Sequence, residues 1–258
     1  LIKPYMSQGD IILFNKIISS FNEYELKARI FPASLTILPF VITILLWFPQ
    51  IISLESSLLI SIISIIILFF LGKLAREKGK KVQSKLIQKW GSLPATLQLS
   101  HLDNTIDIET KKRYHDYLQK NIEGLKLPSR SEEIKNPKSS RNKYESAVKW
   151  LIENTRDTKK FPLLYQDNIN YGYSRNMLGL KWLGMIISIF SLALNFYLLY
   201  SLNYKSIDKV NVNIIISISI NSFIIIIWTF FVNEKWVKST AEAYARTLLS
   251  TCEKSLES

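Results

Sequence analysis

The stretch IIILFFLGKLAREKGKKVQSK, residues 65–85, passes within a few positions from a continuous apolar run to a dense cluster of lysines. A run of roughly 20 apolar residues is long enough to cross the hydrocarbon core of a bilayer as a helix. The apolar run extends back to about residue 54 and ends at Gly72, where the basic segment begins. Because Lys and Arg concentrate on the cytoplasmic side of membrane helices, this junction predicts a span that leaves the membrane on that side.

The basic segment continues into a long polar insert. Residues 73–181 contain 23 Lys and Arg against 12 Asp and Glu, a net charge of +11 out of +12 for the whole chain. We therefore expect residues 73–179 to form a basic, mainly helical cytosolic domain. Helical periodicity predicts helices over 105–123 and 142–155, whereas Pro, Ser, Asn and Gly predict a loop over 127–140 and irregular structure over 156–172.

Two apolar hairpins flank this insert. The sequence predicts spans over about 33–50, 54–72, 180–202 and 212–232, and the short connections within each hairpin are poor in Lys and Arg. By the charge bias, the connections lie outside and both termini lie in the cytoplasm. The predicted fold class is thus an all-α membrane protein with four transmembrane helices in two hairpins and a helical cytosolic insert between the second and third. The expected domains are 1–32, 33–72, 73–179, 180–232 and 233–258.

The two ends of the chain are expected to be helical and cytoplasmic. Residues 9–30 repeat apolar side chains at three- and four-residue spacing, which predicts an amphipathic helix within domain 1–32. Such a helix lies on a membrane surface or packs on its own protein, and the sequence leaves both readings open. Residues 233–258 are predicted to form a C-terminal cytosolic helix.

Chemistry-bearing motifs are scarce. Cys252 is the single cysteine, and His101 and His115 are the two histidines. This composition provides no disulfide framework, and the residue spacing does not support a zinc site. The sequence lacks a nucleophile elbow, a P-loop and a dinucleotide fingerprint. We therefore expect no cofactor, no metal site and no enzymatic activity.

Polar side chains recur on one face of the predicted spans. Ser188, Ser191 and Asn195 lie along the third span, and Ser217 and Asn221 lie along the fourth. Polar residues in hydrocarbon often face a water-filled path, which predicts that these five line a pore. The alternative is that they hydrogen-bond between packed helices. Because four helices are too few to enclose a roomy channel, a pore requires a homo-oligomer.

The insert places basic residues next to aromatic residues, a combination that suits a single-stranded nucleic acid or a nucleotide. The candidate ligand-binding residues are Lys112, Arg113, Arg141, Tyr144, Tyr171 and Arg175. A plain solvated surface is the alternative for these clusters. The lysines and arginine over 73–89 are instead expected to contact anionic lipid at the cytoplasmic membrane face.

Three strings of the insert carry a resemblance to known proteins: TKKRYHDYL (110–118), NPKSSRNKYESAVKWLIENTRD (136–157) and FPLLYQDNINYGYSRNMLGLKWLG (161–184). They resemble four-span membrane effectors of bacterial anti-phage defence, in particular the HalA-like effectors of the Hailong system. The resemblance covers mainly residues 105–185. It implies location in the bacterial inner membrane, a channel domain, and a cytosolic domain that binds a DNA oligomer made by a partner enzyme.

These observations lead to one functional hypothesis and two rivals. The hypothesis is an oligomeric gated pore, controlled by a short single-stranded DNA or nucleotide bound to the basic insert. The main rival is a membrane-anchored scaffold that recruits a partner protein through the insert. A small transporter is a third reading, but charged residues at mid-membrane, which transporters often carry, are lacking from the spans.

Overall fold

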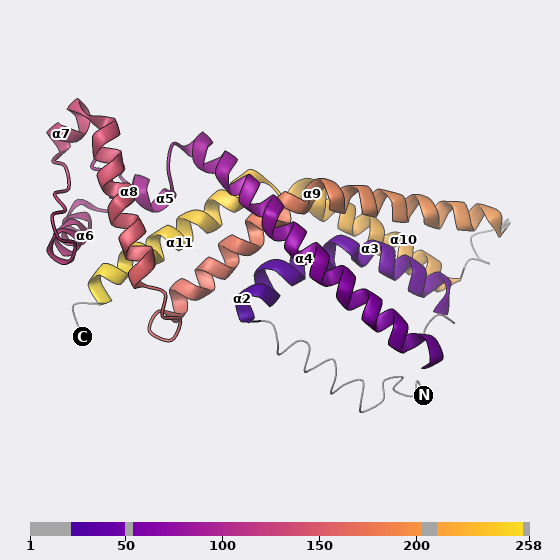
Figure 1. The fold of residues 1–258 in the computed structure, drawn as a ribbon. Helices are drawn as coiled ribbons and strands as arrows, with labels where there is room; N and C mark the ends of the chain where they lie inside the picture. The colour runs from indigo at the N-terminus through magenta and orange to yellow at the C-terminus, as the bar shows by residue number, and fades with distance from the viewer. Residues whose placement is uncertain (1–21, 50–53, 203–210, 255–258) are drawn as a thin grey trace. The chain divides into compact units, whose positions relative to one another are not determined.

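The structure is a computed structural model that describes residues 22–49, 54–202 and 211–254. Within helix α4 the side chains of residues 54–62 and 64 lie outside this description. All the regular elements of the described residues are helices (Figure 1), which confirms the all-helical fold class. In chain order the elements are α2 (Glu23–Glu25), η1 (Leu26–Ile30), α3 (Phe31–Trp47), α4 (Leu54–Trp90), α5 (Pro94–Leu99), α6 (Ile108–Asn121), α7 (Arg130–Lys135), α8 (Pro137–Asn154), α9 (Pro162–Ser201), α10 (Val212–Ile226), η4 (Ile227–Phe231) and α11 (Glu234–Lys254).

Three helical segments among the described residues are long and apolar enough to cross a membrane: Glu23–Trp47, Pro162–Ser201 and Val212–Phe231. They contain the first, third and fourth predicted spans. The second predicted span, 54–72, lies on α4, but many of its side chains are outside the described part. The arrangement of four spans in two hairpins therefore stays a prediction.

The first candidate span begins earlier than the sequence suggests. Asn22 caps the helix start, because its side-chain oxygen accepts a hydrogen bond from the backbone N–H of Glu25 at 2.8 Å. Elements α2, η1 and α3 then follow without interruption up to Trp47. Residues 23–30 thus continue the helix of the span. The rest of the predicted amphipathic helix lies outside the described residues.

The chain divides into two compact units. The first unit comprises residues up to Val82 together with Gly172–Trp236, and the second comprises Gln83–Tyr171 together with residues from Val237 onward. These units are defined by how the residues pack, whereas the five expected domains are defined by their position relative to the membrane. The five domains therefore stay predictions. Helices α4, α9 and α11 each contribute residues to both units.

Each unit has its own buried core. The core of the first unit is formed by Ala75 of α4, Met177 and Leu180 of α9, and apolar residues between Ile224 and Val232. The core of the second unit collects large side chains from α5, α6, α8 and α11, with Leu99, Leu118 and Leu248 fully buried. These side chains repeat at helical spacing, so each helix turns one apolar face to its core.

Two of the sequence-based predictions for the insert are wrong. Residues 127–140 contain α7 and the start of α8 rather than a loop, because Ser129 and Glu132 form a capping box that begins α7 and Pro137 begins α8. Residues 156–172 are not irregular throughout, because Pro162 starts α9 in the same way. Proline was interpreted as a breaker at positions where it occupies a first helical turn.

Candidate functional site

The first unit contains a buried polar cluster among its apolar helices, centred on Thr43 of α3. The amide nitrogens of Asn195 on α9 and Asn221 on α10 each donate to the Thr43 hydroxyl oxygen at 3.0 Å. The Ser217 hydroxyl lies 3.4 Å from the same oxygen. The indole N–H of Trp47 donates to the Asn195 side-chain oxygen at 2.7 Å. We call these five residues the Thr43 cluster; it joins three helices, α3, α9 and α10, that each carry a candidate span.

Burial makes this cluster energetically important. Thr43, Asn195, Ser217 and Asn221 are each 0% exposed. A buried polar group without a partner costs roughly 1–3 kcal/mol, so the hydrogen bonds decide whether these helices pack in this register. Each asparagine amide also donates to a carbonyl one turn back on its own helix at 2.8 Å, and Thr43 donates to the Pro39 carbonyl at 2.9 Å.

One acceptor in the cluster is left over. The side-chain oxygen of Asn221 is buried and has no hydrogen-bond partner. At the same time, the Thr43 oxygen is the acceptor for both asparagine amides. Three side chains from α9 and α10 therefore converge on one oxygen, that of Thr43.

The structure brings three of the five predicted pore-lining residues together and keeps two apart. Asn195, Ser217 and Asn221 meet at Thr43. Ser188 and Ser191 are also 0% exposed, but each hydroxyl donates a hydrogen bond within α9. Ser188 donates to the Gly184 carbonyl and Ser191 to the Ile187 carbonyl, both at 2.7 Å. All five side chains are buried within the single chain. Asn195, Ser217 and Asn221 hydrogen-bond to another helix, as the alternative interpretation expects, and the lining of a pore stays a prediction.

Sequence reasoning missed Thr43, which is the centre of the cluster, and the role of Trp47. The same periodicity argument finds Thr43, because Thr36, Pro39 and Thr43 recur at three- and four-residue spacing on α3 and all three are buried. The indole N–H of Trp47 reaches inward to the side-chain oxygen of Asn195.

The predicted ligand-binding residues do not form one site. Tyr144 is 1% exposed and donates to the Glu133 carboxylate at 3.0 Å. Tyr171 is 5% exposed and stacks on Tyr244 with ring centroids 6.2 Å apart. Both rings therefore belong to the core and offer no open face to a base. Arg175 lies in the first unit, where it donates to the Tyr24 hydroxyl at 3.2 Å.

The other three basic candidates lie at the surface of the second unit. Lys112 is exposed. Arg113 forms a salt bridge of 2.7 Å with Glu253 of α11, and Arg141 donates to the Gly91 carbonyl at 3.2 Å. These three side chains lie where they can contact the phosphates of a ligand. The rings of Tyr144 and Tyr171 are buried and cannot stack on its bases.

A second buried polar cluster lies in the second unit around Glu133 of α7. Its carboxylate accepts from the Tyr144 hydroxyl, from the backbone N–H of His101 at 2.9 Å, and from the Ser100 hydroxyl. The Lys111 ammonium donates to the Ser100 carbonyl at 2.6 Å. Glu133 and Lys111 are 6% and 5% exposed, so both charges are held inside by the turn that follows α5.

The two histidines belong to this cluster. Their rings meet edge to face with centroids 4.9 Å apart. The ring nitrogen Nε2 of His115 lies 2.8 Å from the Leu99 carbonyl, so that nitrogen carries the proton. Burial lowers the pKa of His115. This geometry assigns His115 a structural role in the core. Absence of enzymatic activity stays a prediction.

In the part of the chain that the structure describes, no group of three or more His, Cys, Asp or Glu side chains is placed to hold a metal ion. No protein-family model matches the chain, and the comparisons with curated proteins and with solved structures find no match. The Thr43 cluster, the candidate spans and the charge distribution are therefore the features from which a function can be inferred.

Proposed function

We propose that the protein is an oligomeric gated pore of the bacterial inner membrane that acts in anti-phage defence, with the Thr43 cluster holding the closed state. The observation that carries this proposal is the hydrogen-bonded Thr43 cluster, whose Thr43, Asn195, Ser217 and Asn221 side chains are fully buried among three helices long and apolar enough to span a membrane. Polar side chains at such positions mark ion pathways or the contacts that control them. In this proposal, opening separates α3, α9 and α10 and exposes the five predicted lining residues to water.

The proposed regulator is a short single-stranded DNA or nucleotide that binds the basic surface of the second unit. Lys112, Arg113 and Arg141 supply the cationic contacts. A regulator shifts the gate only by its differential affinity for the two states, so the DNA must bind one state more tightly. The anionic lipids of the inner membrane are the second proposed partner, through the basic residues over 73–89.

The membrane scaffold is the second candidate, and one observation favours it. The five predicted lining residues are all 0% exposed within one chain, as expected for contacts that only hold helices together. In this alternative the candidate spans anchor the protein, and the second unit recruits a partner protein. The two candidates differ in ion flux.

The deciding experiment measures ion flux through proteoliposomes made from full-length protein stripped of nucleic acid by high salt. Flux is recorded with and without short DNA oligonucleotides for the natural chain, Thr43→Val and Thr36→Val. Thr36 is the matched control, because it is also 0% exposed on α3 and donates to a carbonyl one turn back at 2.8 Å.

If the pore is gated at the Thr43 cluster, we expect Thr43→Val to raise the ion flux and Thr36→Val to leave it unchanged. A hydrogen bond between membrane helices contributes on average about 0.6 kcal/mol, and up to about 1.7 kcal/mol. The loss of two such bonds therefore raises the open-to-closed ratio roughly tenfold. Absence of flux from all three correctly inserted proteins, with and without DNA, would reject the pore in favour of the scaffold.

Regulator binding is tested separately with Arg113→Ala combined with Arg141→Ala. We expect weaker binding of single-stranded DNA and a flatter dependence of affinity on salt, because each lost phosphate contact lowers the log–log slope by about 0.7. Arg156→Ala is the control, since Arg156 is an exposed arginine of the same unit outside the proposed site. An unchanged affinity and slope in the double variant would remove this surface from consideration.

A further inference from the structure

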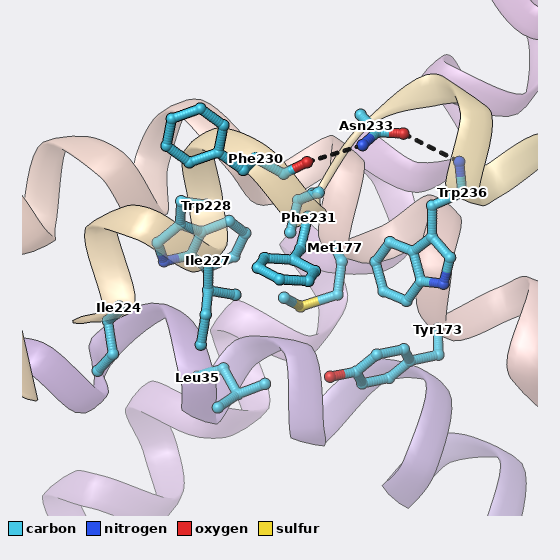
Figure 2. A pocket seen from close by; sticks show the side chains of 11 residues that line it. Leu35, Tyr173, Met177, Ile224, Ile227, Trp228, Phe230, Phe231, Asn233 and Trp236 are labelled. Atoms are coloured by element: carbon cyan, nitrogen blue, oxygen red, sulfur yellow. Dashed lines mark hydrogen bonds between the residues drawn. The ribbon is translucent and has the colours of Figure 1, made fainter.

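The first unit contains an apolar pocket of about 570 Å³ where η4 ends and α11 begins. Figure 2 shows its walls, which come from α3, α9, α10, η4 and α11. Leu35, Met177 and Phe231 supply apolar surface, and Tyr173, Trp228 and Trp236 supply aromatic rings. A pocket of this size and lining suits one apolar ligand or one chain of a larger amphiphile.

The backbone at the end of the fourth candidate span forms this pocket. The five residues of η4 have π-helical geometry, and Val232 follows in an extended conformation. The Asn233 side-chain amide donates to the Phe230 carbonyl at 2.8 Å, and its side-chain oxygen accepts from the backbone N–H of Trp236 at 3.0 Å (Figure 2). Asn233 thereby closes one helix and caps the next, which keeps the walls apart. Wide helical turns of this kind are frequent at functional sites.

The surroundings of the pocket identify the class of ligand. Phe230 and Phe231, at the end of candidate span Val212–Phe231, are 70% and 66% exposed. Large apolar side chains exposed on a span are in contact with lipid when the span is in a bilayer. The pocket opens beside them, because both residues also line it. Lipid chains are thus the most abundant apolar molecules that reach this pocket.

A lysine binds the backbone of a residue that lines the pocket. The Lys181 ammonium donates to the carbonyls of Thr229 and Val232 at 3.1 and 2.8 Å. Val232 is itself a lining residue. An ammonium has three N–H donors, so these two bonds leave one for a phosphate oxygen.

We propose that this pocket binds one acyl chain of a membrane phospholipid, with the phosphate of that lipid beside Lys181. The site goes beyond the proposed pore and does not depend on conduction, since it requires only that the candidate spans lie in a bilayer. A lipid held there contacts α3, α9, η4 and α11 together and fills the space between them. The bound lipid thus becomes part of the packing of the first unit.

The test is quenching of tryptophan fluorescence by phospholipids that carry bromine atoms in their acyl chains. Trp228 lines the pocket but is only 1% exposed, whereas Trp182 is 73% exposed on α9. Two full-length proteins, each keeping one of these tryptophans with the other five changed to Phe, are placed in brominated and ordinary phosphatidylglycerol vesicles. Circular dichroism confirms that each protein is folded.

We expect brominated lipid to quench both tryptophans, Trp182 through the surrounding bilayer and Trp228 through the bound chain. Filling the pocket with Leu35→Phe and Met177→Phe should remove most of the quenching of Trp228 and leave that of Trp182 unchanged. Quenching of Trp182 alone, or quenching of Trp228 that survives pocket filling, would overturn the proposal. If brominated lipid quenched neither tryptophan, both the lipid site and the assignment of the spans to a membrane would be overturned. Absence of ion flux in the earlier experiment would leave the lipid-site proposal standing.

The headgroup contact has its own test. With Trp228 as reporter, Lys181→Gln should raise several-fold the fraction of brominated phosphatidylglycerol needed for half-maximal quenching in ordinary phosphatidylcholine vesicles. Lys235→Gln is the matched control, because Lys235 is an exposed lysine at the start of α11. An equal effect of the two variants would show general attraction of anionic lipid and would overturn the assignment of the phosphate to Lys181.

Discussion

At the residue scale, the hydroxyl of Thr43 carries an unusual share of the contacts between helices. It accepts hydrogen bonds from side chains of α9 and α10 while it donates to its own helix. The hydrophobic effect provides no driving force between apolar helices inside a bilayer, because lipid tails are as apolar as leucine, so packing and hydrogen bonds fix which faces meet. The polar contact at Thr43 supplies such hydrogen bonds to α3, α9 and α10.

This role predicts a difference in stability between two similar threonines. We expect Thr43→Val to lower the free energy of unfolding in detergent micelles by about 1 kcal/mol, because two interhelical bonds are lost. Thr36→Val should lower it by less, since the Thr36 hydroxyl donates within α3. Equal losses in the two variants, measured by denaturant titration, would contradict a special role for Thr43.

A second residue-scale prediction concerns His115 and pH. Burial lowers the pKa of His115 below its ordinary value of 6.5, and His101, Lys111, Asp116 and Tyr144 face its ring. The unfolded chain then binds a proton near pH 6.5 that the folded chain does not, so stability falls as the pH drops below about 6.5. The slope from one such group is at most about 1.4 kcal/mol per pH unit.

The variant His115→Gln removes this proton-binding site from both states. Its unfolding free energy should therefore change less between pH 7 and pH 5 than that of the natural chain, although the variant is less stable at pH 7. Unfolding of the full-length protein by denaturant at the two pH values, followed by near-ultraviolet circular dichroism, measures both quantities. The same pH dependence in both proteins would contradict the buried, neutral state of His115.

At the element scale, glycines determine how closely α4 and α9 approach within the first unit. A Cβ atom added at Gly179 would lie 2.7 Å from the backbone nitrogen of Gly79 and 2.7 Å from the carbonyl carbon of Lys78. The two helices therefore touch backbone to backbone, a contact that small residues permit in membrane helix packing. Gly184 serves α10 and η4 similarly, because an added Cβ would lie 2.3 Å from the Trp228 ring.

This contact predicts that Gly179→Ala destabilises the first unit although alanine favours helices. Backbone atoms of α4 cannot rotate away, so overpacking should cost about 1–3 kcal/mol. Ala193→Val is the control, since it adds volume to α9 at an exposed position. Thermal unfolding in detergent compares the two variants, and similar midpoints for both would contradict the close contact at Gly179.

At the scale of the whole molecule, apolar surface and positive charge are separated along the chain. The candidate spans place exposed phenylalanines and isoleucines on helices whose buried faces are polar at Thr43, Asn195 and Asn221. A soluble protein has the opposite arrangement, with its polar side chains outside. Almost all of the net charge lies within residues 73–181. This separation is what orients a chain across a membrane.

Labelling of introduced cysteines tests the predicted topology. Cys252 is buried and is first changed to Ser, which removes the natural thiol. We expect Tyr200→Cys and Val212→Cys, at exposed positions next to the 203–211 connection, to react in spheroplasts with a reagent that does not cross the inner membrane. Lys112→Cys should react only after the membrane is opened. Labelling of Lys112→Cys in intact spheroplasts would reverse the orientation or place the insert outside.

The amino-acid sequence alone predicts the helical class and the basic character of the insert. Its predicted spans over 33–50, 180–202 and 212–232 overlap the candidate spans Glu23–Trp47, Pro162–Ser201 and Val212–Phe231. These properties depend on the length of an apolar run and on local charge, which are visible without tertiary contacts. The helices over 105–123 and 142–155 were also predictable, because apolar periodicity is local.

Which faces of these helices meet could not be predicted before the helices were packed together. The tertiary structure brought Asn195, Ser217 and Asn221 to Thr43, placed the rings of Tyr144 and Tyr171 in the core, and formed the pocket at Trp228. The physical reason is that a stripe of polar or aromatic residues specifies a helix face but not its partner. The partner depends on close approach at glycines such as Gly179 and on hydrogen bonds between residues about 150 positions apart.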